Sequence, residues 1–110
     1  MANEFFAQKR SRGDGVTTVY ESDRTNFLSY IYITNVCDEN VHFSIYVAPR
    51  GEKYSKDTAM IYREELYTED TDIMGYFIPI FNGTRIGVWC SVSGGVNVTV
   101  FGGSGIAGLV

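Results

Sequence analysis

The sequence contains few of the residues on which metal binding and nucleophilic catalysis depend. Its 110 residues include one histidine, His42, and two cysteines, Cys37 and Cys90. Neither residue type forms a cluster with metal-ligand spacing, so we expect no metal and no other cofactor. A catalytic triad would have to use His42, which has no Gly-Ser-Gly or Cys elbow beside it. These shortages favour a protein that is not an enzyme.

Long apolar runs and an excess of positive charge are also missing. No apolar stretch reaches the roughly 18 residues of a membrane-spanning helix, and residues 1–8 lack the features of a secretory signal. The formal net charge of −4 argues against nucleic-acid binding. Two cysteines are too few for a disulfide framework, so we expect buried thiols in a reducing compartment, with one Cys37–Cys90 disulfide as the alternative.

The residues that are abundant indicate β structure. Aromatic residues make up 15% of the chain, and glycine occurs 12 times. Turn signals such as Asn82-Gly83 and Ser93-Gly94-Gly95 separate alternating segments, and these two predict successive hairpins of the last three strands. We therefore predict an all-β fold, a single antiparallel β-sandwich of about seven strands that is Ig-like or jelly-roll-like. The predicted strands are 16–21, 27–36, 41–50, 59–66, 73–81, 85–92 and 96–101, and the end of 59–66 at Arg63-Glu64-Glu65 would also suit a helix.

The two ends of the chain differ in composition from this sandwich, which we predict over residues 16–102. Residues 1–15 read as an N-terminal docking arm, because Gly13-Asp14-Gly15 separates Phe5 and Phe6 from the first predicted strand. Residues 1–12 hold three basic side chains and one acidic, for a net charge of +2, whereas residues 13–110 hold six basic and twelve acidic, for −6. The Gly-rich tail, 103–110, ends on apolar Leu109 and Val110. The alternative is a frayed polar N-terminus.

Several aromatic residues occupy strand positions that face away from the predicted core. Tyr46, Trp89 and Phe101 lie opposite the clearest core stripes, and strands that are apolar on both faces add Tyr30, Tyr32, Tyr76 and Phe77. An exposed aromatic patch predicts contact with another molecule, although single surface aromatics need no explanation. The predicted interface residues are Phe5, Phe6, Lys9, Arg10, Arg12, Tyr46, Trp89, Phe101, Leu109 and Val110.

Four strand motifs resemble those of small β-sandwich virion proteins of tailed bacteriophages. They are 17–20 (TTVY), 30–35 (YIYITN), 43–51 (FSIYVAPRG) and 97–102 (NVTVFG), and the resemblance covers about residues 5–102. The middle segment 53–68 is less apolar than the family pattern, and the tail after Phe101 is longer.

The resemblance implies a non-enzymatic structural protein of the virion, assembled in the cytoplasm of a bacterial host. The expected role is capsid decoration (cement), in which the protein stabilises the head by bridging capsid subunits. The expected partners are sister copies, with a trimer favoured, and the major capsid protein or another virion protein. One alternative is a neck, tail or fibre-base protein of the same fold. Another is a carbohydrate-binding sandwich that uses Trp89 and tyrosines as stacking platforms.

Overall fold

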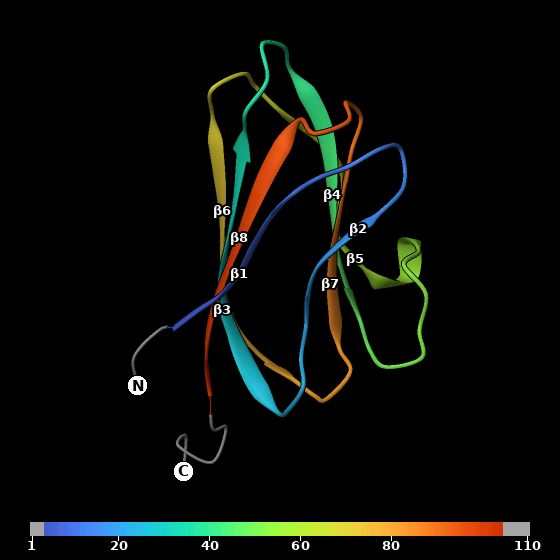
Figure 1. Ribbon diagram of the computed structural model, residues 1–110, viewed down its shortest axis with the longest axis vertical. Helices are drawn as coiled ribbons and strands as arrows, with labels where there is room; N and C mark the ends of the chain where they lie inside the picture. The colour runs from blue at the N-terminus through green and yellow to red at the C-terminus, as the bar shows by residue number, and fades with distance from the viewer. Residues whose placement is uncertain (1–3, 105–110) are drawn as a thin grey trace.

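The computed structural model describes residues 4–104, and their strands form two antiparallel sheets that pack face to face (Figure 1). Leu109 and Val110 of the predicted interface therefore lie outside the described residues. The elements are β1 (Glu4–Arg10), β2 (Thr17–Glu21), β3 (Asn26–Asn35), β4 (Val41–Ala48), the 3-10 helix η1 (Lys56–Thr58), β5 (Ala59–Leu66), β6 (Thr71–Ile80), β7 (Arg85–Cys90) and β8 (Val96–Ser104).

The strand order is that of a jelly roll. The first sheet has the order β1-β8-β3-β6, and the second sheet has the order β2-β7-β4-β5. The predicted antiparallel β-sandwich is confirmed, and of the two folds left open it is the jelly roll that matches this order. β1 begins and β8 ends at the same end of the sandwich, because Glu4 pairs with Gly102 (Figure 1).

The N-terminal segment differs from the sequence prediction. Residues 4–10, expected within a docking arm, pair with β8 as an edge strand of the first sheet, so the described residues contain eight strands. An edge strand tolerates exposed charged residues, and Lys9 and Arg10 therefore concealed the strand pattern. At the other end, β8 continues through Gly103 to Ser104, beyond the predicted end of the sandwich.

The last three strands do not form the predicted hairpins. β6 and β8 belong to the first sheet and β7 to the second, so the turns at Asn82-Gly83 and Ser93-Gly94-Gly95 carry the chain from one sheet to the other. Gly83 and Gly94 have φ angles of 88° and 70°, the left-handed region that glycine adopts without steric cost. The turn positions are therefore correct, and the pairing inferred from them is wrong.

The core between the sheets comes from the inward-facing residues of strands that alternate between core and surface, with the alternation interrupted at register shifts such as that between Leu28 and Tyr30 of β3. Fully buried aliphatic and aromatic side chains point inward from both layers, and burying each contributes about 1.5–3 kcal/mol. The largest fully buried side chains are Leu28, Ile31, Ile33, Val41, Phe43, Ile45, Ile80, Ile86, Val88, Val96, Val98 and Val100.

No helix in residues 4–104 is long and apolar enough to cross a membrane.

Candidate functional site: the outer faces of the two sheets

The outer surface of the first sheet is lined by large apolar side chains, and we term it the aromatic face. Its strands β3, β6 and β8 alternate between the core and this surface, so that Ile31 and Ile33 point inward while Tyr30 and Tyr32 point outward. The most exposed of these side chains are Phe5 (60%), Tyr30 (40%), Tyr32 (37%), Ile73 (54%) and Phe77 (53%). Phe101 and the largely buried Phe27 complete the face.

The rings of the aromatic face contact one another across three strands. Phe5 of β1 and Phe101 of β8 meet edge to face with centroids 6.1 Å apart. Phe101 then meets Tyr32 of β3 at 5.5 Å, and Tyr32 meets Tyr30 at 6.3 Å. Edge-to-face contacts of this kind are each worth about 0.5–1.5 kcal/mol beyond burial. The rings therefore hold each other in fixed positions above the sheet.

Two glycines shape the surface beneath these rings. Gly75 pairs with Tyr30 across the strands, and a Cβ at Gly75 would lie 3.3 Å from the Tyr30 ring. Beside this pair is a hollow of about 400 Å³ lined by Ser29, Tyr30, Gly75 and Phe77. The Phe27 ring lies over Gly103, where a Cβ would be only 2.2 Å away. The aromatic face therefore consists of a ridge of rings next to a hollow.

The polar residues at the centre of the aromatic face, on β3, β6 and β8, are uncharged, whereas Arg10 of β1 lies at its rim opposite Asn97. Thr34 and Thr71 share a hydrogen bond of 3.1 Å, and the Thr99 hydroxyl donates to Gln8 Oε1 at 3.0 Å. The outward positions of β3, β6 and β8 hold no Asp, Glu, Lys or Arg. Association through the centre of this face would therefore desolvate aromatic surface without burying an ion.

The outer face of the second sheet also carries aromatic residues, but an arginine covers two of them. The Arg63 guanidinium lies 4.6 Å from the centre of the Trp89 ring and 5.4 Å from that of Tyr62. Arg63 reaches across β4 from a bulge in β5, where its φ is 52° and its N–H donates to Ser44 Oγ at 2.9 Å. By hydrogen bonding and by its charge, Arg63 lowers the pKa of the exposed Tyr62 phenol. The Trp89 indole N–H donates to the Asp14 carbonyl at 3.2 Å.

The loop between β4 and β5 covers another part of this face. Tyr54 packs on Tyr46, with ring centroids 5.7 Å apart, and its hydroxyl shares a 2.8 Å hydrogen bond with Thr18 Oγ1. Tyr54 can lie this close to the sheet because the residue beneath it is Gly87, where a Cβ would be 2.7 Å from the ring. The Arg85 guanidinium lies 4.8 Å from the Tyr54 ring centre. Tyr46 is consequently only 8% exposed.

The structure separates the aromatic residues of the predicted interface into three groups. Phe5 and Phe101 meet on the aromatic face, as described above. Phe6 points the other way, between the sheets, where its ring stacks on Tyr20 at 5.0 Å. Tyr46 and Trp89 lie on the second sheet, beneath Tyr54 and Arg63, and so they do not share a surface with Phe5.

The basic residues of the predicted interface lie along the edge of the first sheet and just beyond it. Lys9, Arg10 and Arg12 are all exposed. Arg10 Nε donates to the Gly94 carbonyl at 2.6 Å, and the Arg12 backbone N–H donates to Thr17 Oγ1 at 3.0 Å.

On the aromatic face, the sequence pattern did not single out Ile73, which is 54% exposed, and the side chain of Tyr76 lies outside what the structure describes.

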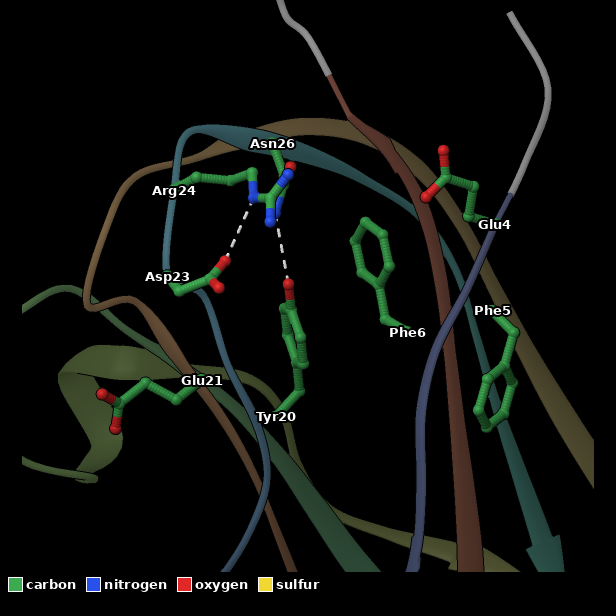
Figure 2. A pocket seen from close by; sticks show the side chains of 8 residues that line it. All are labelled: Glu4, Phe5, Phe6, Tyr20, Glu21, Asp23, Arg24 and Asn26. Atoms are coloured by element: carbon green, nitrogen blue, oxygen red, sulfur yellow. Dashed lines mark hydrogen bonds and ion pairs between the residues drawn. The ribbon is translucent and has the colours of Figure 1, made fainter.

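A second hollow, of about 300 Å³, lies at the end of the sandwich where β1 and the β2–β3 turn meet (Figure 2). Asn26 Nδ2 donates to the Tyr20 hydroxyl and to Ser22 Oγ, both at 3.2 Å, whereas its buried Oδ1 has no partner among residues 4–104. An exposed ion pair, Asp23 with Arg24 at 3.2 Å, lies on the rim. The lining residues are Glu4, Phe5, Phe6, Tyr20, Glu21, Asp23, Arg24 and Asn26.

The cysteines are free thiols in the structure. Cys90 is buried and Cys37 is half-buried, with its Sγ 3.2 Å from Asn35 Oδ1. Burial raises the pKa of the Cys90 thiol. Within the described part of the chain, no group of three or more His, Cys, Asp or Glu residues is placed to hold a metal ion.

Comparisons with known proteins do not assign the chain to a family. No family model and no curated protein matches it. Among solved structures, it aligns with a chain of the structure of infectious bursal disease virus Gx strain, with 11% identity and a TM-score of 0.41. The alignment covers 94% of this chain but only 28% of the viral chain. A match at this level establishes neither a common family nor a common function. Residues 4–104 form a jelly-roll sandwich with one aromatic sheet face that these residues leave exposed.

Proposed function

We propose that the protein is a non-enzymatic structural component of a virus particle that acts by adhesion, and that its role is capsid decoration. The observation that carries this proposal is the aromatic face. Five large apolar side chains are exposed on one sheet, and the outward positions of its strands β3, β6 and β8 hold no charged residue. Burying such a surface against another protein yields roughly 25 cal/mol per Å², less the cost of association.

The assignment to a virion is supported by two features of the chain. Its strand motifs resemble those of small bacteriophage virion proteins, and its strand order is a jelly roll, an architecture found in viral capsid and lectin domains. A neck, tail or fibre-base protein would use the same fold and face, so the two roles differ in location on the particle. The carbohydrate-binding alternative is less favoured, because Arg63 covers a Trp89 ring face that would stack on a sugar.

In the proposed mechanism, each copy adds many weak contacts to a shell that already exists. The aromatic face excludes water from a protein partner, and the exposed Lys9, Arg10 and Arg12 attract an acidic partner surface at the sheet edge. Repetition of the same contacts around the particle raises avidity without new chemistry. A shell bridged in this way resists rupture because several contacts must open together.

The test compares particles assembled with the protein, without it, and with a variant of the aromatic face. Tyr32→Ser combined with Phe101→Ser removes two rings from the face, whereas the matched control Tyr67→Ser removes a 60% exposed ring from the β5–β6 turn. We expect the double variant to be absent from purified particles, and the shells to rupture at a lower temperature, while the control behaves as wild type. Full incorporation of the folded double variant would refute the proposal. Incorporation without any effect on shell rupture, with few copies per particle, would favour the neck or tail.

A further inference from the structure

We infer that the partner of the aromatic face is the aromatic face of a second copy of this chain, related by a two-fold axis. This inference rests on the proposed function, in which the face is a contact surface, and it specifies what covers the face. A two-fold contact brings the same patch of each copy together, so the patch must be complementary to itself in charge, area and shape.

The charge distribution allows two copies to meet at this face. The chain has a formal net charge of −4, so most orientations of two copies bring acidic surfaces together. Glu64 and Glu65 lie on β5 of the second sheet, and Glu69 lies in the β5–β6 turn. Because the outward positions of β3, β6 and β8 carry no charge, apposing the centres of two aromatic faces buries no pair of like charges, and Arg10 of β1 lies at the rim of the face.

The exposed apolar area is on the scale that a dimer of this size needs. Phe5, Tyr30, Tyr32 and Phe77 are each about half exposed, and at about 200 Å² per ring residue they offer roughly 400 Å². Ile73 and the surrounding threonine, proline and glycine positions add to this area. A stable interface buries about 800 Å² on each partner, so the aromatic residues alone supply about half of the requirement.

The shape of the face is also compatible with itself. A ridge runs through Phe5, Phe101 and Tyr32, and the hollow beside Tyr30 has Gly75 at its base. A two-fold axis through the centre of the face places the ridge of one copy against the hollow of the other. Packed sheets lie about 10 Å apart with interleaved side chains, which is the spacing that rings of this size fill.

Association through the edges of the first sheet is blocked by the residues that lie there. The edge strand β6 contains Pro79, which has no N–H to donate to another strand. On the other edge strand, β1, the charged Lys9 occupies the position that pairs with buried Val98, and a charge at such a position disfavours pairing with a further strand. A register shift at Phe5 and Ala7 further disrupts the β1 edge. The uncharged centre of the aromatic face is therefore the part of this sheet that is suited to self-association.

The test measures the mass of the purified full chain by sedimentation velocity, from low to high micromolar concentration. We expect a dimer for the wild type. Tyr32→Glu places a charge near the centre of the face and should weaken dimerisation at least about a hundredfold, whereas Tyr67→Glu, outside the face, should leave it unchanged. Near-ultraviolet circular dichroism establishes that both variants are folded.

A mixing experiment separates a second copy from any other partner. Tyr32→Glu and Tyr32→Lys should each be monomeric alone and should form a heterodimer when mixed, because opposite charges then meet near the axis. A wild type that stays monomeric at every concentration, or an oligomer unaffected by Tyr32→Glu, overturns the inference. If such a protein still joins particles through its aromatic face, the proposed function stands and the partner is a different protein. If it does not join them, the proposed function fails as well.

Discussion

The outer faces of both sheets carry aromatic residues, but the two sets of rings differ in how far other described residues cover them. On the second sheet, Arg63 lies against Trp89, and Tyr54 from the β4–β5 loop lies on Tyr46. On the first sheet, Tyr32 and Phe77 have aromatic neighbours but remain 37% and 53% exposed. The chain thus covers one aromatic surface with its own cations and loop.

This difference shows that aromatic content alone does not identify a contact surface. On the second sheet, other parts of the same chain cover the rings, so we expect the stability of the isolated protein to depend on these contacts. The rings of the first sheet are exposed in the described residues, so under the proposed function their loss should affect association more than folding. Three substitution experiments, in order of decreasing effect, test this separation.

The largest effect is expected where the first sheet itself is disrupted. A Cβ at Gly102 would lie 2.1 Å from the Phe27 carbonyl oxygen, so Gly102→Ala must displace β8 from β3. We expect a loss of about 3 kcal/mol in the free energy of unfolding, measured by urea denaturation. Gly75→Ala is the matched control on the same sheet, since its Cβ would meet only the Tyr30 ring at 3.3 Å and should change stability by less than about 1 kcal/mol. Equal stability of the two variants would contradict the placement of β8.

A smaller effect is expected from uncovering the second sheet. Arg63→Ala removes the guanidinium from the Trp89 and Tyr62 rings and should cost about 1.5 kcal/mol, since it loses two cation–π contacts of roughly 0.5–1 kcal/mol each. Trp89 is the only tryptophan, so its fluorescence should shift to longer wavelength as the ring meets water. Arg63→Gly should give the same spectral shift with a smaller loss of stability, because glycine accepts the φ of 52°. An unchanged emission spectrum in both variants would show that Arg63 does not cover Trp89.

The smallest effect comes from removing one hydroxyl on each face. Tyr54→Phe deletes the hydrogen bond to Thr18 and should lower the free energy of unfolding by about 1 kcal/mol. Tyr32→Phe should change it by less than about 0.5 kcal/mol, since no hydrogen bond to this hydroxyl is recorded within residues 4–104. Thermal unfolding of both variants measures the difference. A larger loss for Tyr32→Phe would reverse the comparison between the faces.

The sequence predicts the strands well where one of their faces is polar. Val96, Val98 and Val100 alternate with Asn97 and Thr99, and this pattern defines the buried side of β8 directly. β3 is apolar on both sides, and a register shift between Leu28 and Tyr30 changes which residues point outward. The exposure of Tyr30 and Tyr32 therefore depends on sheet geometry that a period of two does not encode.

Contacts between distant parts of the chain account for the remaining errors. Tyr46 and Trp89 do face away from the core, as predicted, but Tyr54 and Arg63 reach them through a loop and a bulge that no local pattern reveals. The turn after β7 has the same glycine-rich composition whether it joins neighbours in one sheet or crosses between two. Assigning strands to sheets requires the packing of the whole sandwich.

The position of β8 between β1 and β3 has a consequence for synthesis in the cell. A nascent chain that has emerged only as far as β7 can pair all four strands of the second sheet, whereas β1 still lacks its hydrogen-bonding neighbour in the first. Phe101, the ring that links Phe5 to Tyr32, emerges after all of them. The row of ring contacts from Phe5 to Tyr32 is thus completed only after β8 has been synthesised.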